Sequence, residues 1–200
     1  MVISRRRYMG KKSLLPAGYR QVGWIKSTGT QYINIGIQPD EKFAFTTSII
    51  REQNTPIYGV WGCRNGTIDS TSYQIGSTAS NYIRLDICNI DTTVDVSNIY
   101  GKILFEYNSS VFKMNTISYP VQGRKSLCLH PFLLFGWNNK GSIITRESVF
   151  ESFTAFYDGE KIQDLIPCIN PNNEAGFYCL VRQRFVGNDG TDSFIAGPDV

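Results

Sequence analysis

The sequence has few of the residues that metal sites and nucleophilic catalysis require. It contains one histidine, His130, and five cysteines, no two of which form a C-x-x-C pair. Zinc sites take histidine and cysteine ligands at short spacings, so we expect no zinc site and no cofactor. The nearest nucleophile–base pair is Cys128 with His130, which would share one face of a strand. The simpler interpretation is a histidine at a strand break near a buried thiol, and we therefore expect no enzyme.

Long apolar runs are also missing. The opening MVISRRRYMGKKSLLPAG is basic, but no apolar stretch of about seven residues follows, as a secretion signal would need. No segment approaches the ~20 apolar residues of a membrane-spanning helix. We therefore expect a chain that is made and folded in the cytosol and does not insert into a membrane. In that reducing compartment the cysteines should be small buried thiols: Cys63, Cys88, Cys128, Cys168 and Cys179.

The net charge is small and unevenly distributed. It is +3, which is too small to indicate a polyanionic partner. The first twelve residues nevertheless hold Arg5, Arg6, Arg7, Lys11 and Lys12. We interpret residues 1–13 as a flexible or anchoring arm and residues 14–200 as one domain. Such an arm tracks nucleic-acid phosphates, docks on an acidic protein surface or acts as a solubilising tail. Nucleic acid is not expected, because the arm is short and no matching basic surface is visible behind it.

Helical periodicity is missing as well, whereas strand periodicity recurs along the chain. Residues 42–50 place Phe43, Phe45, Thr47 and Ile49 on one side of an extended chain, and residues 82–88 and 102–107 alternate in the same way. Clusters such as RNGT, YNSS and WNNKGS supply turns between such segments. About a dozen short strands with regular turns predict an all-β domain, an antiparallel sandwich or barrel.

Two local patterns are especially clear. In STGTQYINIGIQP, residues 27–39, the isoleucines Ile33, Ile35 and Ile37 fall on one side of an extended chain, which predicts a strand with one buried face. Further on, Asp158-Gly159 is the pair that a two-residue type I′ turn requires, because both positions need a positive φ. Its alternating apolar flanks predict a β-hairpin around these two residues.

Both ends of the chain resemble one family. At the start, Leu15-Pro16, Tyr19, Trp24-Ile25 and residues 27–33 are similar to the opening of LamG-like, concanavalin A-like jelly-roll domains of gut bacteriophages and bacteria. At the end, the matching motifs are PFLLFGWNNKG, residues 157–159, residues 166–168, residues 176–178 and residues 196–198. The resemblance implies a two-sheet antiparallel jelly roll, with the isoleucines of residues 27–37 between the sheets. Because this fold serves hydrolases, lectins and passive spacers alike, function has to be argued from a site.

The resemblance and the short arm together favour a non-enzymatic bacteriophage virion protein. It would be a capsid decoration, head fibre or tail-associated protein, assembled in the cytoplasm of the bacterial host. Residues 1–13 would anchor it to other virion proteins, and it is expected to be a homo-oligomer because such parts follow local symmetry. The alternative is a lectin-like carbohydrate-binding module of a gut bacterium or phage, with host-surface or mucin glycans as ligands. A glycoside hydrolase ranks third.

Three kinds of site remain to be weighed. Hydrolases of this fold take paired carboxylates from alternate positions of one strand, and neither Glu147 with Glu151 nor the scattered aspartates match that pattern. GNDGTD offers turn oxygens for calcium without a full ligand set: Asn188, Asp189 and Asp192. Exposed aromatic rings would stack on sugars, and the candidates are Trp61, Trp137 and Tyr58, with Trp24 and Tyr73 behind them. The alternative is that these rings fill the core.

Overall fold

The protein is an all-β sandwich of two sheets, as its sequence predicts. The computed structural model describes residues 14–51, 61–66, 71–79, 82–87, 90–121 and 125–200, and it contains no helix within them. The arm and Tyr58 lie outside the described residues. None of the described segments is a helix long and apolar enough to cross a membrane.

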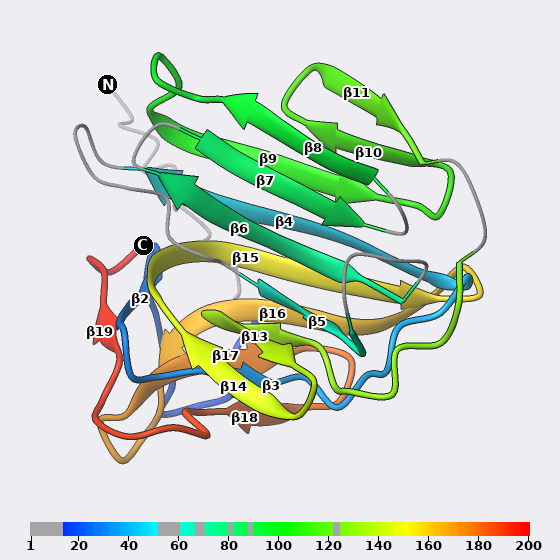
Figure 1. Ribbon diagram of the computed structural model, residues 1–200. Coiled ribbons are helices and arrows are strands. Elements are labelled where there is room, and N and C mark those ends of the chain that lie inside the picture. The colour runs from blue at the N-terminus through cyan, green and yellow to red at the C-terminus, as the bar shows by residue number, and fades with distance from the viewer. Residues whose placement is uncertain (1–13, 52–60, 67–70, 80–81, 88–89, 122–124) are drawn as a thin grey trace, which may run out of the picture.

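The larger sheet has a long central path with three short strands beside it (Figure 1). Its order is β11 (Ile117–Pro120), β10 (Val111–Met114), β9 (Gly101–Tyr107), β4 (Phe43–Arg51), β15 (Glu147–Tyr157), β16 (Glu160–Ile169), β17 (Ala175–Cys179) and β18 (Arg184–Val186). Beside this path, β1 (Arg20–Gln21) pairs with β16, and β2 (Ile25–Thr28) pairs with β15 and β19 (Ile195–Ala196). All of these pairings are antiparallel.

The smaller sheet lies over the larger one and nearer the viewer in Figure 1. Its order is β14 (Ser142–Thr145), β13 (Gly136–Asn139), β5 (Trp61–Arg64), β6 (Tyr73–Ala79), β7 (Tyr82–Ile87) and β8 (Ile90–Asp95). A further strand, β12 (Leu133–Leu134), joins β5 to β3 (Ile33–Asn34). Its pairings are antiparallel except that of β13 with β5, which is parallel.

Alternation along the strands fills the space between the sheets with large side chains. In β4 the predicted inward residues Phe43, Phe45, Thr47 and Ile49 are all buried, and β7 and β9 bury theirs in the same way. Trp61 is 0% exposed, with its ring centroid 4.9 Å from that of Phe105. Burying one such aromatic side chain contributes about 1.5–3 kcal/mol, so this aromatic core supplies much of the drive to fold.

The hairpin prediction is confirmed, and the opening-strand prediction needs a correction. Asp158 and Gly159 have φ of 52° and 81° and join β15 to β16. The isoleucines of residues 33–37 are buried as predicted. However, residues 27–39 do not form one strand, because the chain turns at Gly29, with φ of 110°, and crosses from β2 in the larger sheet to β3 in the smaller one.

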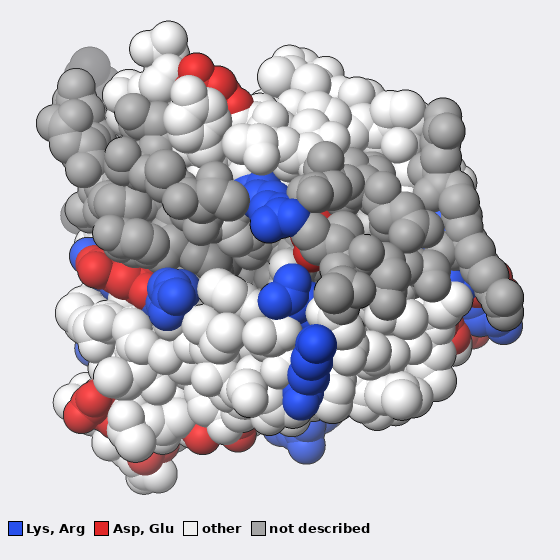
Figure 2. Space-filling model, in the orientation of Figure 1, with Lys and Arg blue, Asp and Glu red and all other residues white. Residues whose placement is uncertain are grey.

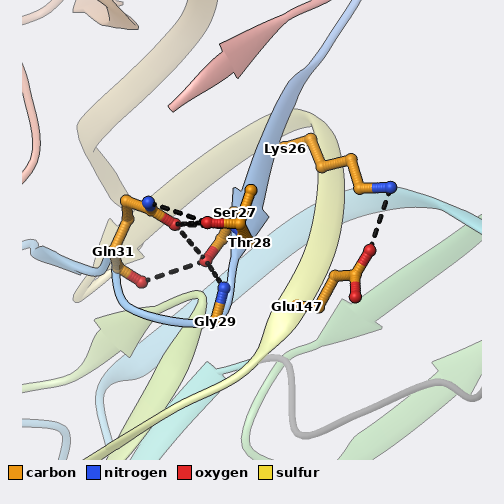
Figure 3. A network of polar contacts seen from close by, with 6 residues as sticks. All are labelled: Lys26, Ser27, Thr28, Gly29, Gln31 and Glu147. Atoms are coloured by element: carbon orange, nitrogen blue, oxygen red, sulfur yellow. Dashed lines mark hydrogen bonds and ion pairs between the residues drawn. The ribbon is translucent and has the colours of Figure 1, made fainter. Parts of the chain in front are cut away.

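The turn between β2 and β3 is held by the side chain of Gln31, which is 0% exposed (Figure 3). Its Oε1 accepts hydrogen bonds from the Ser27 hydroxyl at 2.9 Å and from the Thr28 amide at 2.7 Å. Its Nε2 donates to Thr28 Oγ1 at 3.0 Å and to the carbonyl of Ser193 at 3.2 Å. The polar residues of STGTQ therefore satisfy one another and a segment near the end of the chain.

That closing segment, residues 188–193, is bound to the opening turn at several points. The Tyr32 amide donates to Asn188 Oδ1 at 3.1 Å, and the Asn34 amide donates to Asp189 Oδ2 at 2.7 Å. The Thr30 hydroxyl donates to Asp192 Oδ2 at 2.9 Å. We call residues 27–34 and 188–193 together the clasp. It joins the opening motif, residues 27–33, to a segment that lies shortly before the closing residues 196–198 and is almost as far away in sequence as the domain allows.

Candidate functional site

The two tryptophans singled out from the sequence have different surroundings. Trp61 lies in the core against Phe45, Phe105 and Phe150, so its ring is not available to stack on a sugar and the core alternative holds for it. Trp137 is half-buried in β13 of the smaller sheet, and the Arg146 guanidinium carbon lies 5.3 Å from its ring centroid. Tyr58 and the arm residues Arg5, Arg6, Arg7, Lys11 and Lys12 lie outside the described residues.

The candidate calcium turn uses its oxygens to hold the clasp. Asn188 Oδ1 accepts from the amides of Tyr32 and Gly190, and Asp192 Oδ2 accepts from Thr30. No group of three or more histidine, cysteine, aspartate or glutamate side chains is placed to hold a metal within the part of the chain that the structure describes. GNDGTD therefore has a structural role in the fold, that of a turn locked by its own side chains.

The other sequence candidates are held in separate places. Glu147 pairs with Lys26 at 2.9 Å (Figure 3), and Glu151 pairs with Lys102 at 2.8 Å. Residues 128–130 lie in an irregular segment rather than a strand, so the argument that Cys128 and His130 share a strand face does not apply. Cys63, Cys128, Cys168 and Cys179 are buried and free of disulfides, and burial raises the pKa of the Cys168 thiol to about 12.

A cluster of polar side chains instead covers the outer face of the smaller sheet. Strands β5, β6 and β7 send Cys63, Ile75 and Leu85 into the core, and the alternate positions therefore point outward. The cross-strand register places Gln74 opposite Asp86 and Asn139 beside Arg64. We call this cluster the outer-face row, and its members are Arg64, Gln74, Arg84, Asp86, Trp137 and Asn139. Figure 2 shows basic side chains running down the middle of the face on which this sheet lies.

Hydrogen bonds link the outer-face row across four strands. Arg64 Nε donates to Asn139 Oδ1 at 2.8 Å, which connects β5 to β13. Gln74 Nε2 donates to Asp86 Oδ2 at 2.6 Å, which connects β6 to β7. The Arg64 guanidinium lies 3.9 Å from the same Asp86 oxygen, so the two halves of the row meet there.

The carboxylate of Asp86 is the most perturbed group in the row. Its side chain is 1% exposed, and burial raises its pKa from 3.8 to about 6. The hydrogen bonds from Gln74 and Ser72 and the positive charges of Arg64 and Arg84 lower the pKa without offsetting the burial. A buried carboxylate whose pKa is shifted by burial and by specific charges is typical of functional sites.

Several polar atoms of the row have no partner. Gln74 Oε1, Asp86 Oδ1 and Trp137 Nε1 are buried and make no hydrogen bond within the described residues. Leaving such an atom without a hydrogen-bond partner lowers the free energy of unfolding by roughly 1–3 kcal/mol. Three of the six such atoms in the described residues belong to the row; the other three are Trp61 Nε1 in the core and Ser148 Oγ and Glu151 Oε2 on β15, the last of which lies in the ion pair with Lys102.

A concave region lies at the edge of the larger sheet. A groove of about 580 Å³ lies beside β17, β18 and β19, lined among others by Glu174, Phe185, Asp192 and Phe194. Its carboxylates already have partners, since Glu174 Oε2 accepts from the Asn170 amide at 2.6 Å and Asp192 accepts from Thr30. The groove is large enough for a small ligand, but these two carboxylates are already engaged in hydrogen bonds within the protein.

Sequence reasoning missed most of the outer-face row. Arg84 and Asp86 were visible as outward positions two apart in one strand, whereas Arg64, Gln74 and Asn139 come from three other strands. These side chains come together only through the cross-strand register, which the periodicity of a single strand does not reveal. A scan against protein-family models found no match, and a search of curated proteins found no similar one.

Proposed function

We propose that the protein is a non-enzymatic bacteriophage virion protein that displays a jelly-roll domain of the LamG-like, concanavalin A-like type. Its role would be adhesion or particle stabilisation, as a capsid decoration, head fibre or tail-associated protein. The motifs at the two ends of the sequence support this proposal, and so does the β-sandwich in which these ends are joined by the clasp.

The observation that carries the adhesive role is the outer-face row. It combines a half-buried indole, planar amides and guanidinium groups with a buried carboxylate on one sheet face. Sugar-binding sites are built from such components, an aromatic surface and a few fixed polar groups. Host-surface or mucin glycans are therefore the proposed ligands of this face.

Residues 1–13 are proposed as the anchor to other virion proteins. Their five basic residues suit an acidic surface on a neighbouring protein, and the protein is expected to be a homo-oligomer assembled in the cytoplasm of the bacterial host. Nucleic acid and membrane are not proposed as partners.

Mass spectrometry of density-banded particles from lysed cultures of the source tests the virion assignment. Peptides of this chain at levels comparable to the major capsid protein are expected for a decoration protein, and lower levels for a tail part. If the peptides occur in cells and not in particles, the virion assignment is wrong. The second candidate, a free lectin-like module, then remains, because the outer-face row favours glycan binding in either setting.

A further inference from the structure

We infer that the groove beside β17, β18 and β19 is the docking site of the chain's own basic arm, residues 1–13. This inference goes beyond the proposed virion role and does not depend on it. Three features carry it: the charge of the groove, the place where the arm joins the domain and the composition of the arm.

The groove is acidic, and no basic side chain neutralises it. Glu174 and Asp192 line it, and no lysine or arginine is among the described residues that do. Both residues are exposed, and their hydrogen-bond partners are neutral: the Asn170 amide donates to Glu174 Oε2, and the Thr30 hydroxyl donates to Asp192 Oδ2. The second oxygen of each carboxylate accepts no hydrogen bond within the described residues. Two negative charges in contact with solvent are therefore left for a cationic partner.

The arm joins the domain at the border of this groove. Arg20 of β1 pairs with Ile169, which lines the groove. The ring centroid of Tyr19 lies 6.2 Å from that of Phe185, another lining residue. Just before them, Leu15 is buried in the small apolar cluster against which Phe185 packs. Thirteen residues reach roughly 40 Å when extended, so the groove lies within reach of the arm of the same molecule.

The composition of the arm matches that of the groove. Residues 1–13 contain five basic side chains and no acidic one, and Tyr8 and Met9 lie among the charges. The groove places Phe185 and Phe194 in the same lining as its carboxylates. Guanidinium groups pair with carboxylates and stack on aromatic rings, and a volume of about 580 Å³ has room for a few side chains of such a segment.

The covalent connection favours the chain's own arm over a basic segment of another molecule. A segment joined to its site by a short linker is present there at an effective concentration on the order of millimolar. A second copy, or another basic protein, would have to be equally concentrated to compete. In a virion protein, the anchor would thus be held against its own domain until a neighbouring protein with a more acidic surface displaces it.

NMR of the full chain tests this inference. The backbone amide shifts of residues 5–12 are compared with those of a synthetic peptide of residues 1–13, at low and at high protein concentration. The arm should differ from the peptide at both concentrations, and NOEs should connect Tyr8 or Met9 to Phe185. High salt should move the arm shifts toward those of the peptide, because ion pairs in an exposed groove are screened.

The double variant Glu174→Gln/Asp192→Asn should release the arm, so that its amide shifts become those of the peptide. Both new amides keep an oxygen for Asn170 and Thr30, so only the charges are removed. Glu41→Gln/Glu160→Gln is the matched control, because it removes two charges from exposed positions, and Glu160 lies at the end of β16 away from Ile169. It should leave the arm shifts unchanged.

Three results would overturn the inference. The first is an arm whose shifts equal those of the peptide in the unmodified chain. The second is contacts that appear only at high protein concentration, since the occupant would then be the arm of a second copy. The third is release of the arm by the control as complete as that by Glu174→Gln/Asp192→Asn, because the attraction would then come from the overall charge. None of these results bears on the virion assignment, which the particle measurement decides.

Discussion

The clasp and the outer-face row are both polar, but they differ in how completely their buried polar atoms are hydrogen-bonded. In the clasp, Gln31 is fully buried and both ends of its amide are hydrogen-bonded. In the row, Gln74 uses its Nε2 toward Asp86 and leaves its Oε1 without a partner in the described residues. A buried amide whose hydrogen bonds are all made rigidifies a fold. A buried amide atom without a hydrogen-bond partner lowers the stability of the folded chain, and it indicates a role other than stability. We therefore regard the clasp as a structural element and the outer-face row as the proposed binding surface.

The sharpest way to break the clasp is Gln31→Ala. The substitution removes the acceptor of Ser27 and Thr28 and the donor to Ser193 in a site with no solvent access, so we expect the free energy of unfolding to fall by about 3 kcal/mol. Urea denaturation measures the loss. Thr30→Ala is the matched control, because it removes only exposed hydrogen bonds, those to Asp192 and to the Thr191 carbonyl, and should cost about 1 kcal/mol or less. Equal losses in the two variants would show that Gln31 is not the centre of the clasp.

The opposite result is expected in the row, where Asp86→Asn should stabilise the protein at neutral and alkaline pH. The folded-state pKa of Asp86, about 6, lies above the value of 3.8 for the unfolded chain. The folded state therefore binds the proton more tightly, and stability is lost as pH rises from about 4 through 6. Asn removes the charge, so the variant should gain roughly 1–3 kcal/mol above pH 7 and nothing below pH 4.

Denaturation curves at pH 4 and pH 8 measure this change. Asp95→Asn is the control of opposite sign, because hydrogen bonds from Ser97 lower the pKa of the exposed Asp95 and its contribution is present above the unfolded-state pKa and lost as pH falls. If Asp86→Asn destabilises the protein at pH 8 as well, the carboxylate is a structural partner, and the contrast between row and clasp disappears.

Much of the fold follows from the sequence, because alternation and turn chemistry are local. The buried faces of β4, β7 and β9 and the hairpin at Asp158-Gly159 were predictable from residue order alone. The break within residues 27–39 was not, because it depends on the side chain of Gln31 reaching Ser193 from far along the chain. Trp61 and Trp137 both lie next to a glycine and shortly before turn residues, yet Trp61 lies in the core and Trp137 is half-buried on the outer face of the same sheet. The row was still harder to predict, since it joins four strands whose register is set by the packed core.

The smallest effect is expected for Trp137→Phe, which tests whether the row is shaped for a ligand rather than for stability. Phe keeps a ring under the Arg146 guanidinium and removes a buried N–H that has no partner within the described chain, so unfolding should change by less than about 0.5 kcal/mol. Binding of a host-surface or mucin glycan, measured by NMR titration, should nevertheless weaken several-fold because the ligand loses that donor. A large loss of stability would place Trp137 among the structural residues. A variant that is unchanged in both stability and binding would restrict the row to Arg64, Gln74, Arg84, Asp86 and Asn139.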